Sequence, residues 1–364
     1  MKQLGTIGLA FAIAGNLLGA GFVSGQELWQ YFGVFGKNAF FGMILGFFVL
    51  YLVTVMLLRY AQREEISEVD ALIIRRQSPL LRMLVGAVTM FFMFCTYVVM
   101  AAGAGSLTEQ AFSVPHYIGS GLLCLAVALV TLSGVSGFLR VFSLFVPVIL
   151  IFIFGLCVFT SPRFTLEELE RIEGAGDNPM LSNWALSALN NATYNAGCSL
   201  GVFSVMAGRI KNKRTLYLGV LLGTVILMAI SAVIIVMMFS SLDVVSFSLP
   251  MVAYAAKTDA RTGLVFSLLL LCAMFATSVA TSVAIAYYLR AKVRIAQRRG
   301  TYIIFVTVIS VVAFAGSLAG FSELVSVVYP ISGYIGFLFV ALVAYNYLHS
   351  VLKSKKQNNK KEQL

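Results

Sequence analysis

Apolar runs of about 20 residues, separated by short clusters of basic residues, constrain the fold of this chain more than any other feature. A helix needs about 20 apolar residues to cross a bilayer, and strands cross one only as a closed barrel. Hydrophobic residues make up 60% of the sequence and charged residues only 11%, against roughly 25% charged residues in a soluble domain. The sequence therefore predicts an all-α integral membrane protein.

The apolar runs fall into two sets of five expected membrane helices, about ten in all. The first set is 4–32, 39–58, 84–107, 117–133 and 141–160. The second set is 183–206, 216–239, 263–289, 302–319 and 324–348. The expected organisation is a five-helix unit at 1–160, a connector at 161–182, a second five-helix unit at 183–349 and a basic tail at 350–364.

The positions of lysine and arginine predict the orientation, because cytoplasmic loops of membrane proteins carry an excess of both. With the N-terminus in the cytoplasm, 21 of the 26 basic residues fall on the cytoplasmic side. The five on the outside are Lys37, Arg163, Arg171, Lys257 and Arg261. We therefore expect a multi-pass protein of a plasma (inner) membrane, with both termini and the basic tail cytoplasmic and the connector extracellular.

Several function classes are disfavoured by composition. The five cysteines lie inside apolar runs without C-x-x-C spacing, and the chain has two histidines, so a disulfide framework, a zinc site and a Ser-His triad are not expected. The basic residues are not gathered on a soluble face that could bind nucleic acid, and there is no phosphate-binding G-x-x-x-x-G-K-[ST] loop. We expect a non-enzyme without a cofactor, whose partners are the lipid bilayer and a small-molecule substrate; monomer and homodimer are both left open.

Three motifs recur in matching helices of the two sets. The pairs are Ala20-Gly21-x-x-x-Gly25 with Ala196-Gly197-x-x-x-Gly201, Gly42-x-x-x-Gly46 with Gly219-x-x-x-Gly223, and Ser143-x-x-x-Pro147 with Ser326-x-x-x-Pro330. Small-x-x-x-small motifs are also common in helix packing, so one match alone carries little weight. Since five is an odd number, two such units have opposite topology, and the matches predict two inverted five-helix repeats.

The first helix of each repeat contains residues that weaken a helix. The segment 15–21 places three glycines in mid-span, and the segment 190–197 places several polar residues and a glycine at the corresponding depth. Each glycine lowers helix stability by about 1 kcal/mol relative to alanine, and unpaired backbone at membrane depth is tolerated only where it lines a protein-enclosed or watered cavity. We therefore predict that helices 1 and 6 are both discontinuous, which in inverted repeats indicates a transport site.

A resemblance to a known family appears at these residues. The segment Ala14-Gly15-Asn16-Leu17-Leu18-Gly19-Ala20-Gly21 resembles the unwound segment in the first helix of LeuT-fold neurotransmitter:sodium symporters. The longer segment 19–27 resembles the start of the YkvI-like family of predicted amino-acid permeases in the amino acid–polyamine–organocation superfamily. The resemblance implies a LeuT-like fold and a secondary active transporter, a cation-coupled symporter for a small amino acid or related amine-bearing metabolite.

The resemblance also implies which residues bind the substrate: Asn16, Gly19, Ala20, Gly21, Tyr97, Asn191, Thr193, Tyr194 and Asn195. Backbone amides at 19–21 would hold a carboxylate, in agreement with the partial positive charge at an exposed helix N-terminus. Tyr97 would close over the substrate, with simple helix packing as the alternative. The residues from 191 to 195 would surround the substrate side chain and amine.

For a coupling ion, the resemblance implies one sodium held by carbonyls of Gly15 and Leu18 and by hydroxyls of Ser278, Thr281 and Ser282. The alternative is that these hydroxyls bond only to carbonyls of their own helix. Phe22 replaces the asparagine that ligates a second sodium in the symporters, and Gly25 replaces their gate arginine. The second sodium site is therefore expected to be absent and the outer gate to differ.

Glu27 is the only acidic residue inside an expected span. Ionisable residues within a membrane are functional candidates by default, so Glu27 is a candidate for proton coupling. It is expected near the outer end of the first helix, where the alternative is a simply hydrated carboxylate. A rival function for the whole chain is a non-transporting ligand sensor built on the same fold.

Overall fold

The computed structural model of the protein describes residues 3–66, 72–74, 79–133, 145–172, 178, 180–292 and 298–362. The elements of the first half are α1 (Thr6–Leu17), α2 (Ala20–Val23), α3 (Gln26–Tyr31), η1 (Gly33–Asn38), α4 (Ala39–Arg63), α6 (Pro79–Phe112), α7 (His116–Ser133), α9 (Phe145–Thr160) and α10 (Leu166–Ile172). Those of the second half are α11 (Trp184–Ala207), α12 (Lys213–Phe239), η2 (Leu242–Ser246), α13 (Pro250–Thr258), α14 (Ala260–Lys292), α15 (Arg299–Ser317) and α16 (Phe321–Glu362). The predicted all-α architecture is confirmed.

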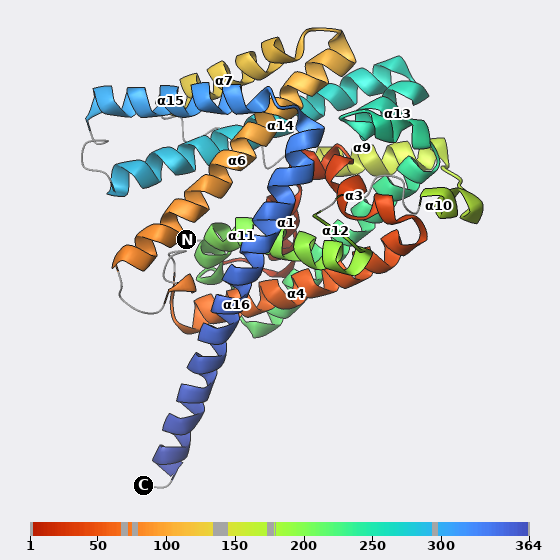
Figure 1. The fold of residues 1–364 in the computed structure, drawn as a ribbon. Coiled ribbons are helices and arrows are strands. Elements are labelled where there is room, and N and C mark those ends of the chain that lie inside the picture. Colours follow the sequence, from red (N-terminus) through yellow and green to blue (C-terminus); the bar gives the residue numbers. More distant parts are fainter. Residues whose placement is uncertain are drawn as a thin grey trace.

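The long helices form two groups (Figure 1). One group contains α1, α4, α11 and α12, and the other contains α6, α7, α14 and α15. Helix α16 packs against α11 and α4 of the first group and against α6 of the second, and runs on without interruption to Glu362. The space between the two groups, crossed by the first span, is where a solute site can form.

Two asparagine caps set the beginnings of α11 and α12. The Asn183 Oδ1 atom accepts a hydrogen bond from the Leu186 backbone N–H at 2.9 Å, and Asn212 Oδ1 accepts from the Thr215 N–H at 2.8 Å. Each cap satisfies a backbone donor that a helix N-terminus leaves unpaired. The two asparagines therefore set the residues at which α11 and α12 begin.

Glycines of the repeated Gly-x-x-x-Gly motif allow close packing between the two expected repeats. A Cβ atom at Gly46 would lie 3.1 Å from the Ala188 carbonyl oxygen of α11, and one at Gly223 would lie 3.0 Å from the Ala10 carbonyl oxygen of α1. Glycine therefore allows α4 to approach α11 and α12 to approach α1 at backbone distance. The second helix of each expected repeat packs on the first helix of the other. The first member of the third motif pair, at 143, lies outside the described residues.

The first span is discontinuous, as predicted. Helix α1 ends at Leu17, Gly19 is extended with φ −75° and ψ 165°, and α2 begins at Ala20. A second turn follows at Gly25, whose φ of 84° lies in the left-handed region that favours glycine. The first span therefore consists of three short helices with different directions.

The prediction that helix 6 is discontinuous is wrong, because α11 is a single helix of 24 residues. Its polar side chains do not interrupt it, since they are bonded to neighbours. Asn190 Nδ2 donates to the Pro330 carbonyl oxygen at 3.0 Å, and the Thr193 hydroxyl donates to the Gly333 carbonyl oxygen at 2.9 Å. Polar residues in a span cost little when each finds a partner, so the helix continues through them.

Among the described residues, seven helices are long and apolar enough to cross a membrane by length and composition. They coincide with the expected spans on η1 and α4, α6, α7, α12, α14, α15 and α16. The other three expected spans fall on the short helices α1 to α3, on α9, and on α11, whose apolar character is lowered by its asparagines. In the described part of the chain, every expected span therefore overlaps helical structure; the first part of the span expected at 141–160, residues 141–144, lies outside it.

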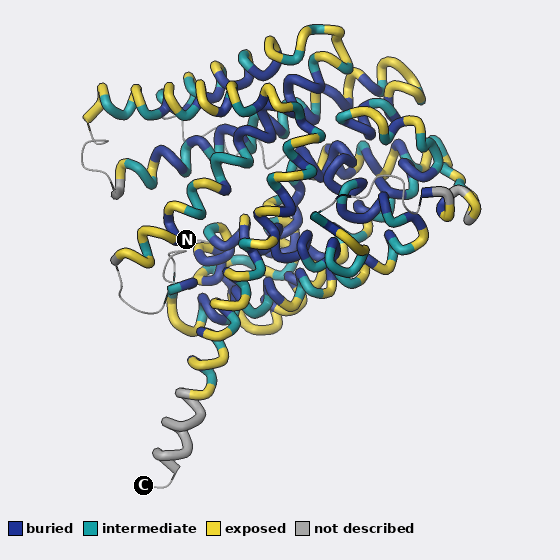
Figure 2. The backbone as a smooth tube through the Cα atoms, viewed as in Figure 1, coloured by how far each residue is buried: buried dark blue, intermediate teal, exposed yellow. Residues whose placement is uncertain are grey.

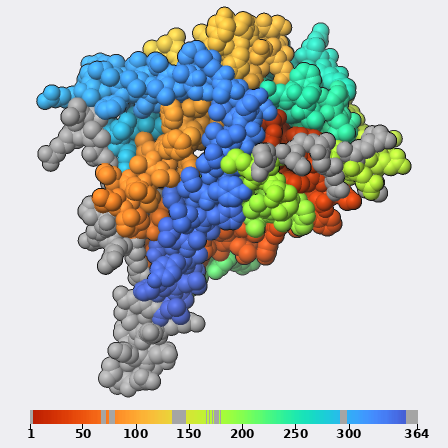
Figure 3. All heavy atoms as spheres, viewed as in Figure 1, coloured from red at the N-terminus to blue at the C-terminus, as the bar shows by residue number. Residues whose placement is uncertain are grey.

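Large apolar side chains cover the outward faces of the bundle. Val158 and Phe159 on α9 are each 78% exposed, and Ile151 is 73% exposed. Figure 2 shows the buried segments gathered in the interior and the exposed segments on the outer helix faces, and Figure 3 shows α6 and α16 side by side on one face. Apolar surface of this extent marks a lipid-facing exterior, as expected of a membrane protein.

Candidate functional site

The break in the first span rearranges the backbone hydrogen bonds. In a continuous helix the Gly19 N–H would bond to the Gly15 carbonyl oxygen, but it bonds to the Leu17 carbonyl oxygen at 2.9 Å. The Leu18 N–H still bonds to Ala14 at 2.8 Å. The break therefore releases the Gly15 carbonyl oxygen from its helical partner, at the depth predicted from the glycines.

A cavity lies at this break, between the two helix groups. The first span and α11 contribute Phe11, Ala12, Gly15, Asn16, Leu17, Leu18, Gly19, Glu27, Tyr194, Asn195, Gly197, Cys198, Ser199 and Val202 to its lining. The helices α6, α9, α14 and α16 contribute Thr89, Phe92, Met93, Thr96, Met100, Pro147, Ile149, Ala273, Ala276, Thr277, Ala280, Thr281, Ala284 and Tyr329. It extends from the middle of α11 toward the C-terminal end of that helix, which lies beside the start of the chain, where the Leu4 N–H bonds to the Arg209 carbonyl oxygen at 2.8 Å.

Glu27 reaches this cavity from α3, although the sequence placed it near the outer end of a straight helix. Its side chain is 4% exposed, and Oε1 accepts a hydrogen bond from Asn191 Nδ2 at 3.4 Å. A Cβ atom at Gly21 would lie 3.4 Å from Oε2. The turn at Gly25 directs α3 back toward the break, so the expectation of a hydrated carboxylate near the membrane surface is wrong.

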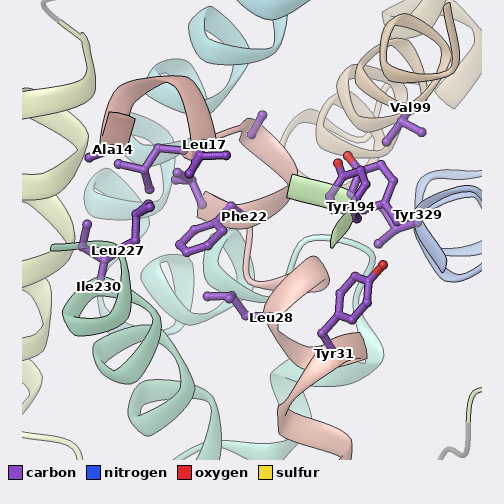
Figure 4. Packing of buried hydrophobic residues seen from close by; sticks show 14 of the residues in the cluster. Ala14, Leu17, Phe22, Leu28, Tyr31, Val99, Tyr194, Leu227, Ile230 and Tyr329 are labelled. Atoms are coloured by element: carbon purple, nitrogen blue, oxygen red, sulfur yellow. The ribbon is translucent and has the colours of Figure 1, made fainter. Parts of the chain in front are cut away.

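Three tyrosines from separate helices lie beside Glu27. The rings of Tyr194 and Tyr329 stack with their centroids 4.5 Å apart, and Tyr31 stacks on Tyr194 at 6.4 Å. Figure 4 shows Tyr194 and Tyr329 together, with Tyr31 close to both. The Tyr31 hydroxyl donates to Asn190 Oδ1 at 3.1 Å. Sequence reasoning missed Tyr31 and Tyr329, because only the folded chain brings α3 and α16 to α11.

Of the residues predicted to bind substrate, Asn16, Gly19, Tyr194 and Asn195 line the cavity. Ala20 and Gly21 are buried behind the break. Asn191 donates a hydrogen bond to Glu27, which lines the cavity, and Thr193 donates a hydrogen bond to α16. The structure thus brings four of the nine predicted residues to the cavity, and it places Ala20, Gly21, Asn191 and Thr193 behind its lining.

Tyr97 does not line the cavity and faces α7 and α15 instead. Its hydroxyl donates to the Cys124 carbonyl oxygen at 3.3 Å and to Ser310 Oγ at 3.2 Å, which belong to α7 and α15. The residues of α6 that line the cavity include Thr96 and Met100 instead. This matches the packing alternative for Tyr97, whose hydroxyl is satisfied within its own helix group.

The hydroxyls predicted to hold sodium divide between two faces of α14. Thr281 lines the cavity together with Gly15 and Leu18. Ser278 is buried and donates to the Met274 carbonyl oxygen at 2.8 Å, while Ser282 Oγ accepts a hydrogen bond from Thr131 Oγ1 at 3.0 Å. The structure therefore brings three of the five predicted sodium ligands to one cavity.

On the far side of the break, the first span is bonded to α16 and α13. Gln26 Nε2 donates to Ser322 Oγ at 2.7 Å, and the Met251 N–H donates to the Ser24 carbonyl oxygen at 3.0 Å. Both bonds lie next to the turn at Gly25, where the resemblance predicted a different outer gate. These contacts close the end of the site that is opposite to the cavity.

The chain is similar to two proteins of Bacillus subtilis (strain 168). It is 24% identical to the uncharacterized membrane protein YkvI over 333 residues, which cover 91% of this chain and 93% of YkvI. It is 25% identical to the uncharacterized protein YyaD over 339 residues, 92% of this chain and 94% of YyaD. No family model matches the chain. The YkvI resemblance read from residues 19–27 therefore extends over nearly the whole chain.

The fold is similar to that of solved LeuT-fold transporters. The structure of MhsT in complex with L-phenylalanine matches with a TM-score of 0.61 at 16% identity, covering 97% of this chain and 98% of MhsT. The inward-facing conformation of Mhp1 matches with a TM-score of 0.58 at 13% identity, covering 94% of this chain and 76% of Mhp1. The predicted LeuT-like fold is confirmed, and these neighbours are transporters rather than enzymes.

Proposed function

We propose that this protein is a cation-coupled symporter for a small amino acid or a related amine-bearing metabolite. The observation that carries the proposal is the cavity at the break of the first span, which lies between two helix groups and contains a buried carboxylate. Ligand sites of this fold type form where interrupted helices meet in mid-membrane. The similarity to MhsT, which was solved with L-phenylalanine, supports an amine-bearing solute.

Within this proposal, the substrate lies against Asn16, Gly19, Tyr194 and Asn195. These residues line the cavity from both sides of the break. Ala20, Gly21, Asn191 and Thr193 support them from behind, as their buried positions indicate. The apolar residues of α6 and α9 in the lining give the rest of the solute a hydrocarbon environment.

Sodium is the proposed coupling ion, with Glu27 as the candidate for proton coupling. The released Gly15 carbonyl oxygen is a hard ligand of the kind that small cations prefer. Thr281 Oγ1 donates to the Thr277 carbonyl oxygen at 2.9 Å, which leaves its lone pairs available to a cation. Gly15, Leu18 and Thr281 therefore fit a sodium ion better than Ser278 and Ser282 do.

Transport would occur by alternating access. We place the protein in a plasma membrane with ten spans, two inverted repeats and both termini cytoplasmic, as the distribution of basic residues predicts. The cavity then faces the cytoplasm, and the bonds from Gln26 and Met251 close the outer side. The similarity to inward-facing Mhp1 supports this assignment.

A thermal-shift screen of the purified protein tests the function. Amino acids and amines are added in sodium and in potassium buffer, and a substrate raises the unfolding temperature because it binds only the folded state. We expect at least one of them to stabilise the protein more in sodium. Thr281→Ala should reduce that sodium dependence more than Ser282→Ala, because Thr281 alone of the two lines the cavity.

Uptake into proteoliposomes separates transport from sensing. A stabilising solute that accumulates under a sodium or proton gradient supports symport. A solute that binds but shows no flux under any gradient would contradict the proposal and favour the ligand sensor. Equal effects of Thr281→Ala and Ser282→Ala on sodium dependence would contradict the proposed ion site.

A further inference from the structure

Among the described residues that line the cavity, Glu27 is the only one with a carboxyl group, and none is a lysine, arginine or histidine. Glu27 is 4% exposed, and its carboxyl group accepts a hydrogen bond from the neutral amide of Asn191. Burying an ionised carboxylate is costly unless a cation or several donors accompany it. No side chain in the lining supplies that cation, so the carboxylate favours a positively charged ligand in the cavity.

Several side-chain hydrogen-bond donors around the cavity are engaged within the protein. Asn16 Nδ2 donates to Ser199 Oγ at 2.7 Å, and Asn195 Nδ2 donates to the Asn191 carbonyl oxygen at 3.0 Å. The Thr281 hydroxyl donates to its own helix. An amide whose N–H group is engaged offers its carbonyl oxygen, which is an acceptor. The polar groups at the cavity are therefore suited to a ligand that donates hydrogen bonds.

The aromatic neighbours favour the same kind of ligand. Tyr194 on α11 and Tyr329 on α16 both line the cavity together with Glu27, and their rings stack on each other. A cation near the face of a tyrosine is attracted to the ring. A carboxylate would instead lie in a cavity whose described lining has a carboxylate and no lysine, arginine or histidine.

We propose that Glu27 is the specificity-determining residue of the carrier and selects monocationic amines over α-amino acids. The ammonium group binds between the Glu27 carboxylate, Asn195 Oδ1 and the tyrosine rings, and the hydrocarbon part lies against Phe92 and Ile149. This assignment rests on the proposed function. It restricts the proposed substrates from amine-bearing solutes in general to amines without a carboxylate. An ammonium ion neutralises the buried carboxylate, whereas an amino acid brings a second carboxylate into the site along with its ammonium group.

Matched pairs that differ only by the carboxylate test the proposal. The pairs are ethylamine with alanine, isobutylamine with valine, isoamylamine with leucine and phenylethylamine with phenylalanine, with sodium present throughout. Dissociation constants are obtained from thermal shifts of the detergent-purified protein. We expect at least one amine to bind about tenfold or more tightly than its parent amino acid, since like charges in one buried site repel. Isoamyl alcohol, the neutral analogue, should not bind.

Two variants connect the preference to Glu27. Glu27→Gln should abolish amine binding, and Glu27→Asp, which keeps the charge, should retain the preference for the amine at lower affinity. Binding of a parent amino acid as tight as that of its amine would overturn the proposal, as would unchanged amine binding in Glu27→Gln. If the protein concentrates an amino acid but does not take up the corresponding amine, the proposed amine selectivity is overturned and the symporter function stands. Failure of the selectivity is therefore distinguishable from failure of the proposed function.

Discussion

Replacing Glu27 by glutamine is expected to raise the unfolding temperature of the ligand-free protein while it abolishes uptake. The wild-type carboxylate is 4% exposed beside a neutral amide, and removal of an uncompensated buried charge relieves its desolvation cost. Glutamine has nearly the same shape and can still accept a hydrogen bond from Asn191. Stability and transport should therefore change in opposite directions.

The loss of uptake should be large, because truncating one partner of a buried charge pair costs about 2 to 5 kcal/mol of binding. Differential scanning fluorimetry and flux in proteoliposomes measure the two effects. Glu109→Gln is the matched control, since Glu109 is exposed at the end of α6, and we expect it to change neither quantity. A Glu27→Gln protein with lower ligand-free stability and normal flux would contradict this account of the site.

Gly336→Ala is expected to destabilise the protein and to disturb the cavity. A Cβ atom at Gly336 would overlap the backbone carbonyl oxygen of Thr193, and a backbone atom cannot move aside as a flexible side chain can. Helix α16 would have to shift away from α11. The hydrogen bonds from Asn190 to Pro330 and from Thr193 to Gly333 would lengthen with that shift.

Overpacking of this kind costs about 1 to 3 kcal/mol, so the unfolding temperature of Gly336→Ala should fall clearly. Because Tyr329 lies on α16 and lines the cavity, ligand binding should weaken as well. Gly155→Ala is the control, since a Cβ atom at Gly155 on lipid-facing α9 would meet nothing within 4 Å. Equal unfolding temperatures of the two variants would show that α16 and α11 are not packed as described.

The positions of the helices and the break in the first span were predictable, because both follow from local rules. Apolar runs between basic clusters define spans, and glycines at 15, 19 and 21 weaken a helix wherever it packs. The continuity of α11 was not predictable from its own residues. Polar residues such as Asn190 and Thr193 suggest a helix break when the local sequence is considered alone. Only their hydrogen bonds to α16, far along the chain, show that their polar groups are satisfied.

Only part of the candidate site could be predicted from the sequence, because some of its residues are brought together by contacts between distant segments. Asn16, Gly19 and Tyr194 follow from the motif and line the cavity. The position of Glu27 depends on one left-handed turn at Gly25, which changes the direction of the chain by an amount that periodicity does not encode. Tyr329 is brought to the site by the packing of α16, which no local pattern near residue 27 could indicate.

The central claim is that solute binds in the cavity at the first-span break while that cavity faces the cytoplasm. Cys198 lines this cavity and is exposed, whereas Cys124 is buried. A membrane-impermeant, cationic thiosulfonate reagent can therefore be applied to inside-out and right-side-out vesicles. Cys198→Ser identifies the labelling that belongs to Cys198 alone.

We predict that Cys198 is labelled rapidly in inside-out vesicles and slowly in right-side-out vesicles, and that a transported solute slows the labelling. The bound solute would block the path to the thiol, and the bonds at Gln26 and Met251 would close the outer side. Labelling that is equally fast from both sides and unchanged by any transported solute would contradict the account.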